Sequence, residues 1–130
     1  MIGRQHAGDE AFRVDWVSGA CMLVRRAAFE QAGLLDEGFF MYWEDADWCR
    51  RIGRAGFNVY CVPRARVVHH EGGSSGRRPA RLVWAFHRSV YRYYAKHEAP
   101  QVWNPLRVVA AVGLTARAAS IVAVNFARSR

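Results

Sequence analysis

Apolar residues and helix-stopping glycines follow one another along this chain in a pattern that predicts three helices before residue 98. A short helix is predicted over 26–32 and ends at Gly33, and a second helix over 44–55 ends at Gly56. A third helix is predicted over 80–97, where apolar and aromatic residues share one side and basic residues share another.

Short apolar runs between turn residues predict the extended segments. Residues 14–25 end in an apolar run typical of a buried strand, and two β-rich runs, 57–62 and 66–70, are separated by Pro63. The glycine- and serine-rich stretch 71–76 is a predicted loop. This order of strands and helices predicts a mixed α/β fold, in which no strand is followed by a phosphate-binding glycine loop.

A final helix is indicated over residues 106–126, whose only charges are Arg107 and Arg117. The stretch is long enough to span a bilayer, but Arg117 near its centre would cost about 2.5–3.5 kcal/mol there. A helix that lies in the membrane interface avoids that cost. The alternative is a helix that packs against another part of the protein or against a partner subunit.

Charge is divided unevenly between the two halves of the chain. Residues 1–60 carry seven arginines and nine acids, a net charge of −2, whereas residues 61–130 carry twelve basic residues and two acids, a net charge of +10. The basic half predicts an anionic partner, for which phosphates, a membrane surface and nucleic acid are candidates. The sequence has no helix-turn-helix, zinc-finger or RNA-binding signature, which argues against nucleic acid.

The cysteines and the N-terminal residues favour a cytoplasmic location. Three cysteines, which stand within apolar runs and lack CxxC spacing, predict buried, reduced thiols of an intracellular protein. Residues 1–10 lack the apolar core that a signal peptide needs. The apolar content is ample for one packed domain, or for part of one, and argues against disorder.

Three carboxylates, Glu44, Asp45 and Asp47, lie next to aromatic residues at the start of the predicted 44–55 helix. Carboxylates near apolar surface are usually ion-paired, bound to a cation or used in proton transfer. Asp47 lies four residues before Arg51, which predicts a solvated ion pair on the helix surface. Glu44 suits the helix dipole as well as it suits a catalytic role. Asp45 lies on the apolar side of the first turn and is the candidate general base.

Two histidines, His69 and His70, end the 66–70 run and open into the glycine loop. A histidine in this position can coordinate a metal or contact a phosphate, or it can simply hydrogen-bond at the end of a strand. Strand alternation directs the two rings to opposite faces, so at most one of them reaches the site.

Five ordered blocks of sequence resemble the C-terminal half of bacterial family 2 glycosyltransferases, in particular the rhamnosyltransferase-like and galactofuranosyltransferase-like members. The blocks are residues 14–20 (VDWVSGA), 25–29 (RRAAF), 33–37 (GLLDE), 39–47 (FFMYWEDAD) and 67–70 (VVHH). The resemblance extends over residues 14–97. It implies a partial GT-A fold, its acceptor-side half, followed by amphipathic helices.

The same resemblance implies an inverting transferase that moves a sugar, with rhamnose as a candidate, from a nucleotide donor to an acceptor hydroxyl. It assigns Asp45 as the general base and His69 as a ligand of a divalent metal, Mg²⁺ or Mn²⁺. It places substrate binding on Trp16, Ser18, Gly19, Trp43 and Glu44. A glycine at position 19 also allows close approach of a ligand.

The resemblance divides the chain into a lead-in segment (1–13), the C-terminal half of a catalytic domain (14–76) and a basic helical region (77–130). The family's nucleotide-binding half, with its DxD motif, is missing, so we expect a truncated product, a fragment or a misplaced start that is inactive alone. The expected partners are a nucleotide sugar and a saccharide or lipid-linked acceptor at the inner face of the cell membrane, in synthesis of envelope polysaccharide or glycolipid. The alternatives are a non-catalytic basic module that binds a membrane or nucleic acid, and an inactive remnant.

Overall fold

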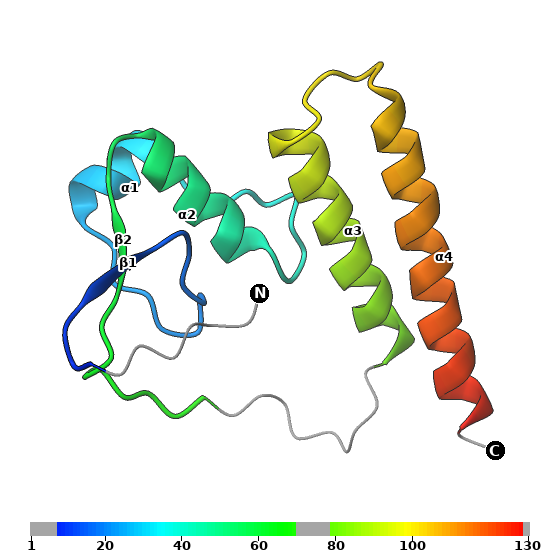
Figure 1. The fold of residues 1–130 in the computed structure, drawn as a ribbon, viewed down its shortest axis with the longest axis horizontal. Coiled ribbons are helices and arrows are strands. Elements are labelled where there is room, and N and C mark those ends of the chain that lie inside the picture. Colours follow the sequence, from blue (N-terminus) through cyan, green and yellow to red (C-terminus); the bar gives the residue numbers. More distant parts are fainter. Residues whose placement is uncertain (1–7, 70–78, 129–130) are drawn as a thin grey trace.

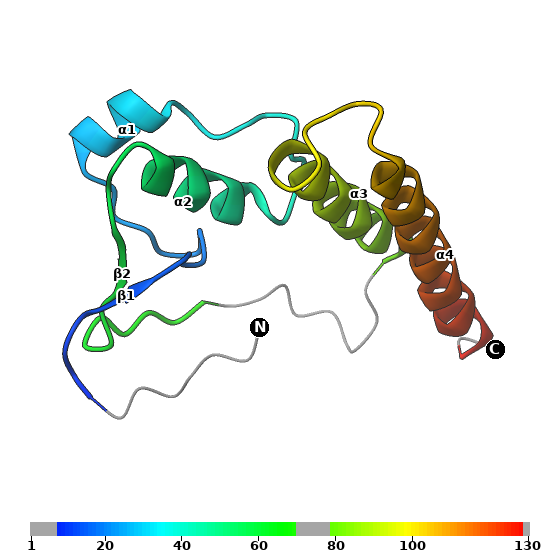
Figure 2. The same ribbon diagram turned by 45° about the horizontal axis from the view of Figure 1, so that its top comes forward.

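The computed structural model describes residues 8–69 and 79–128. Its elements are, in chain order, β1 (Phe12–Val14), α1 (Arg26–Ala32), α2 (Glu44–Arg54), β2 (Val59–Cys61), α3 (Ala80–His97) and α4 (Pro105–Ala127). The strands gather with α1 and α2 on one side, and α3 and α4 stand side by side on the other (Figure 1, Figure 2). The mixed α/β architecture is as predicted, although the described residues are mostly helical. The predicted division after residue 76 falls outside them and stays a prediction.

The two strands form an antiparallel pair in which Phe12 lies opposite Cys61 and Val14 lies opposite Val59. β2 falls inside the run 57–62, where the sequence predicts a strand. The pair ties the segment before α1 to the segment after α2, and so closes the chain around these two helices.

The buried strand predicted at the end of 14–25 is wrong. Only Val14 of that range belongs to a strand, the backbone that follows is irregular, and Leu23 is 101% exposed. An apolar run forms a strand only when a neighbouring strand hydrogen-bonds to its N–H and C=O groups. In the described part of the chain β1 and β2 pair only with each other, so residues 15–25 have no such neighbour. Residues 66–69 are irregular for the same reason, and residue 70 lies outside the described range.

The helices lie where the sequence pattern predicts them, and two glycines mark their ends as expected. Gly33, with a φ of 74°, follows α1, and Gly56, with a φ of 88°, lies just beyond α2. Both angles are in the left-handed region that glycine adopts without strain, so the chain can turn sharply at each helix end.

Tyr42 and Trp43 place the N-terminus of α2 against α3. Both residues have a φ of 68°, which is strained for large side chains. Packing offsets the strain, because the Trp43 ring centroid lies 5.0 Å from that of Tyr93, and the Tyr42 centroid lies 5.6 Å from that of Phe86. This aromatic contact fixes the start of the helix that carries the three acids.

Asp47 is buried between α2 and α3, which corrects the solvated ion pair predicted from its spacing. The pairing with Arg51 is confirmed, since Arg51 Nε donates to Asp47 Oδ2 over 2.9 Å. However, Asp47 is 0% exposed, and both Lys96 Nζ and His97 Nε2 lie 2.7 Å from its Oδ1 atom. These partners come from α3, 49 and 50 positions further along the chain, which helical spacing cannot reveal.

Asp36, in the loop before α2, forms ion pairs with two residues on the basic side of α3. Its carboxylate lies 2.7 Å from Arg92 Nη2 and 2.7 Å from Lys96 Nζ. Burial acts to raise the pKa of Asp36, but the hydrogen bonds from Lys96 and Arg92 outweigh it and bring the pKa well below its ordinary value. The positive charge that α3 offers to an external partner is therefore smaller than the sequence indicates, with Arg81 and Arg88 still exposed.

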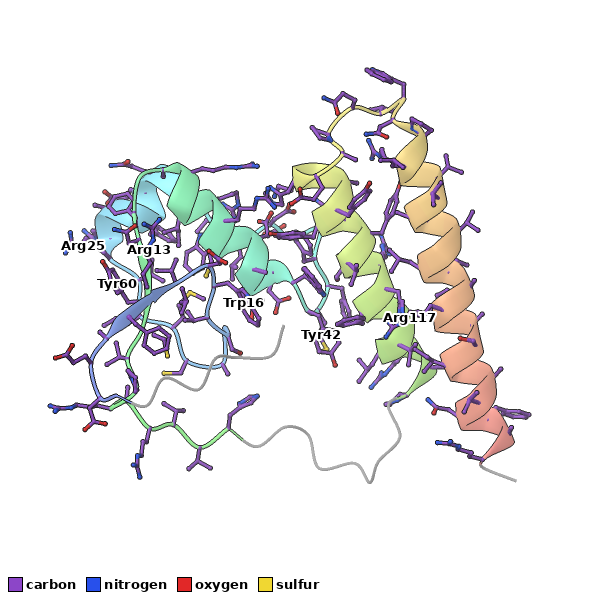
Figure 3. All side chains as sticks on the ribbon, viewed as in Figure 1. Arg13, Trp16, Arg25, Tyr42, Tyr60 and Arg117 are labelled. Atoms are coloured by element: carbon purple, nitrogen blue, oxygen red, sulfur yellow. The ribbon has the colours of Figure 1, made fainter. Side chains whose placement is uncertain are left out.

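α4 packs lengthwise on α3 as the second arm of a helical hairpin. It begins after Asn104, whose side chain accepts the Leu106 N–H over 3.0 Å. Arg117 donates to His87 Nε2 over 2.8 Å, and Figure 3 shows Arg117 directed toward α3. Among the described helices, α4 alone is long and apolar enough to cross a membrane, by length and composition.

Candidate functional site

Asp45 lies half-buried in the first turn of α2, where two backbone N–H groups hold its carboxylate. Gly19 N–H donates to Oδ2 over 3.0 Å, and Ala46 N–H donates to Oδ1 over 2.8 Å. Gly19 comes from the irregular segment before α1, so the structure brings together two of the predicted site residues. These two hydrogen bonds fix the orientation of the carboxylate that is the candidate proton acceptor.

A second contact fixes the segment that carries Gly19 along α2. The backbone of Val17 lies close enough to the thiol of Cys49, one helical turn beyond Asp45, to lower its pKa. Burial raises the pKa of the Cys49 thiol, which packs as a small apolar group and is 1% exposed. The contacts of Val17 with Cys49 and of Gly19 with Asp45 therefore fix this segment along α2 and orient the Gly19 backbone toward Asp45.

The prediction that all three cysteines are buried is wrong for Cys21, which is exposed in the irregular segment before α1, and Cys61 is half-buried.

Trp16 and Ser18 flank this attachment. The Ser18 hydroxyl accepts the Ala20 N–H over 3.3 Å, which stabilises the turn at Gly19. Trp16 is 41% exposed, and Figure 3 shows it close to the first turn of α2. Both side chains are accessible to a ligand, and their substrate role stays a prediction.

Trp43 and Glu44 directly precede Asp45, and they differ in whether their side chains are available to a ligand. The Trp43 ring packs against Phe86 as well as Tyr93, so much of it is used to hold α2 on α3. Glu44 has a buried carboxylate oxygen, Oε2, without a hydrogen-bond partner among the described residues. A buried oxygen of this kind is normally satisfied by water or by a ligand. Glu44 therefore offers a hydrogen-bond acceptor beside Asp45.

His69 is exposed in the irregular segment after β2. Within residues 8–69 and 79–128, no three His, Cys, Asp or Glu side chains lie close enough together to hold a metal ion. The described residues therefore do not by themselves fit a divalent cation, and His69 can supply one ligand at most.

The buried layer around Asp47 is the part of the site that sequence reasoning missed. Burial acts to raise the pKa of Asp47, but hydrogen bonds from Lys96, Arg51 and His97 outweigh it and hold the pKa below its ordinary value of 3.8. Burial also lowers the pKa of His97, so its ring is neutral near pH 7 and donates to Asp47 through Nε2. Because Asp47 follows Asp45 in the same turn, this layer anchors the turn that carries the candidate base.

Comparisons with known proteins identify the family of the chain. The family described as "Glycosyltransferase like family 2" matches residues 3–98. An N-acetylglucosaminyl-diphospho-decaprenol L-rhamnosyltransferase of Mycobacterium tuberculosis is 43% identical over 117 residues, which are 90% of this chain and 38% of that protein. Rhamnosyltransferase WbbL of Escherichia coli is 37% identical over 86 residues, 64% of this chain and 31% of that protein. The dTDP-rhamnosyl transferase RfbF of Shigella flexneri is 28% identical over 92 residues, 71% of this chain and 31% of that protein.

These relatives are much longer than the chain, which spans 38% of the first and 31% of the other two. No solved structure matches the chain.

Proposed function

The chain belongs to glycosyltransferase-like family 2, and we propose from this that it forms the acceptor-side part of an inverting transferase with a GT-A fold. Rhamnose is the leading donor sugar, because the three relatives are named as rhamnosyltransferases. The product is an envelope polysaccharide or a glycolipid, and a portion of protein outside this sequence holds the donor nucleotide. The observation that carries the proposal is the Asp45 carboxylate, held by Gly19 at the start of α2.

Asp45 acts as the general base in this proposal. The acceptor hydroxyl donates a hydrogen bond to the carboxylate and loses its proton to it as the hydroxyl oxygen attacks the anomeric carbon of the donor. The bond from that carbon to the nucleoside diphosphate breaks in the same step, and its electron pair leaves with the diphosphate. Attack from the side opposite the leaving group inverts the configuration. The Gly19 N–H keeps the carboxylate oriented until the transfer.

The residues around Asp45 recognise the acceptor. Glu44 accepts a hydrogen bond from a second hydroxyl of the acceptor through its half-buried carboxylate. Trp16 offers an exposed aromatic face, of the kind that lines small-molecule sites. Ser18 and Trp43 shape the two sides of the same region.

The test of this function is transfer of labelled rhamnose from its nucleotide donor, using the complete reading frame that encodes the chain. We expect a glycosidic product whose anomeric configuration is opposite to that of the donor. A product with retained configuration, or no transfer from rhamnose or other hexose donors, would contradict the proposal.

A methyl group at position 19 is expected to slow transfer without weakening the fold. A Cβ on Gly19 would lie 3.5 Å from Asp45 Cβ and 3.9 Å from Oδ2, which is ordinary contact. We expect Gly19→Ala to change the free energy of unfolding by less than about 0.5 kcal/mol. We expect it to lower kcat by roughly tenfold, because the methyl group occupies space beside the carboxylate. Urea unfolding and steady-state kinetics measure the two effects.

Gly53→Ala is the matched control for this substitution. Gly53 lies inside α2, and a Cβ there meets no atom within 4 Å. Alanine favours helix over glycine by about 1 kcal/mol, so this variant is expected to be more stable and to transfer sugar at the wild-type rate. Equal kinetics for the two variants would remove Gly19 from the site.

His69 is proposed as one ligand of a divalent cation whose other ligands lie outside the described residues. When bound, such a cation neutralises the diphosphate of the donor. We expect His69→Ala to weaken Mn²⁺ binding by at least about 10-fold, measured by electron paramagnetic resonance in the presence of the nucleotide sugar. His70→Ala is the comparison variant, since the role is assigned to His69 alone. Unchanged Mn²⁺ affinity in His69→Ala would end this assignment.

The acceptor is proposed to be a saccharide or a lipid-linked saccharide at the cytoplasmic face of the cell membrane. The name of the Mycobacterium tuberculosis relative specifies N-acetylglucosaminyl-diphospho-decaprenol. A non-catalytic nucleic-acid module is less well supported, because Arg92 and Lys96 of the basic side of α3 pair with Asp36.

A further inference from the structure

The outer face of α4, which is the side turned away from α3, carries exposed apolar side chains at both ends of the helix. Six large side chains between 48% and 66% exposed form it: Leu106, Val108, Val109, Val112, Val124 and Phe126. Residues 113–123 lie between the two ends of this set and contain four alanines together with the exposed Thr115, Arg117 and Ser120. Almost none of the most apolar part of α4 is buried.

Two polar side chains of α4 have hydrogen-bond partners within the hairpin. Arg117 donates to His87 of α3, and the Ser120 hydroxyl donates to the Arg117 carbonyl over 2.8 Å. Arg107 and Asn125 are half-buried, whereas Val109 and Val112 are exposed. A helix on the surface of a water-soluble domain has the opposite arrangement, with its apolar stripe covered and its polar side in water.

We infer that the hairpin of α3 and α4 docks on a lipid bilayer with anionic headgroups, with α4 in the plane of the interface and its outer face in the acyl boundary. The inference deepens the proposed membrane location and rests on it, but its test requires no sugar transfer. Charge complementarity favours this partner, because α3 and α4 contain no acid, while Arg81 and Arg88 are exposed. Trp103, at the tip of the hairpin, is 82% exposed, and tryptophan is enriched at membrane interfaces.

The packing of α4 on α3 favours an in-plane helix over a spanning one. With 23 residues, α4 is about 34 Å long, enough to cross a hydrocarbon core of about 30 Å. However, α3 lies alongside and carries Arg81, Arg88, Arg92 and Lys96. If α4 spanned the bilayer, these charges would enter the hydrocarbon core or α3 would separate from α4. In-plane docking of α4 leaves α3 in contact with water.

A groove lies between the two helices of the hairpin. It has a volume of about 210 Å³ and is lined by Trp84, Arg88 and Tyr91 of α3 and Leu114 of α4, among others. Exposed arginine beside aromatic rings is typical of the boundary between acyl chains and phosphates. The groove therefore places cationic and aromatic groups beside the apolar face.

Vesicle flotation of the 130-residue chain tests the inference, with phosphatidylcholine vesicles that contain or lack phosphatidylglycerol. We expect wild-type protein to float with the anionic vesicles and to be released by alkaline carbonate, as an in-plane helix is. We expect Val112→Glu to bind at least about tenfold more weakly, because it places a charge in the acyl boundary. Val68→Glu is the matched control, since Val68 is 83% exposed outside the hairpin, and it should float like wild type. Circular dichroism verifies that both variants keep their helices.

Three outcomes would overturn the inference. The first is equal flotation of wild type and Val112→Glu, and the second is retention of the protein after carbonate, which indicates a spanning helix. The third is an oligomer that Val112→Glu dissociates, without vesicle binding by wild type, which makes the face a protein interface. None of these outcomes depends on whether the reading frame transfers rhamnose, so failure here and failure of the proposed function are distinguishable.

Discussion

Asp45→Asn is expected to lower the rate of sugar transfer by about 10²- to 10⁴-fold, the range that general-base catalysis contributes. An asparagine oxygen can still accept the Gly19 N–H, so the turn at the start of α2 should keep its shape. What is lost is the capacity to take a proton from the acceptor hydroxyl. Because binding is preserved, we expect the loss in kcat with little change in the KM of donor or acceptor. Steady-state kinetics of the complete reading frame measure both parameters.

Variants of two other carboxylates test whether the loss of kcat is specific to Asp45. Asp9→Asn removes an exposed acid, 3.6 Å from Arg64, and should leave kcat unchanged. Glu44→Gln keeps a hydrogen-bond acceptor beside Asp45 and should raise the KM of the acceptor more than it lowers kcat. If Asp45→Asn retained the wild-type kcat while Glu44→Gln lost it, the base would be Glu44.

The helices could be predicted from the sequence because their signals are local. Gly33 and Gly56 stop α1 and α2 through their own backbone preference, and the sides of α3 follow from spacing of 3.6 residues. The predicted strand before Arg25 was wrong because an apolar run shows only that a segment can be buried. Whether it becomes a strand depends on a partner elsewhere in the chain, and Leu23 has none among the described residues.

In the candidate site, too, the features with a local signal could be predicted and the long-range contacts could not. The position of Asp45 in the first turn of a helix follows from local spacing, and the structure adds its hydrogen bond to Gly19. The environment of Asp47 could not be predicted, because spacing shows its partner Arg51 but not Lys96 and His97 on α3. Long-range ion pairs leave no periodic signal in a single sequence.

Asp47→Ala is expected to destabilise the fold by about 3–5 kcal/mol, a large part of the total stability of a small domain. The carboxylate is 0% exposed, and its removal takes an acceptor from Arg51, Lys96 and His97 at once. Asp47→Asn should cost nearly as much, because the amide lacks the negative charge and presents donors where the partners also donate. Urea unfolding followed by circular dichroism measures both variants.

Asp9→Ala is the control for stability, since its ion pair with Arg64 is exposed and its loss should cost less than about 0.5 kcal/mol. An equal, small loss for Asp47→Ala would mean that the buried layer does not hold α2 on α3. Loss of kcat in Asp47→Asn under conditions where the variant remains folded would show that the layer also positions Asp45.

Acid should weaken the wild-type fold through two groups of this layer. The pKa of His97 lies below 6.5 in the folded protein, so its contribution is present above pH 6.5 and falls as the unfolded chain takes up a proton below it. The pKa of Asp47 lies below 3.8, so its contribution is present above pH 3.8 and is lost as the pH falls through the folded value. The lowered pKa of each group therefore predicts that the folded protein is less stable in acid. In Asp47→Ala the fall below pH 3.8 should flatten, because the carboxylate that binds the proton is absent, whereas an unchanged acid limb would assign it to other carboxylates such as Asp36.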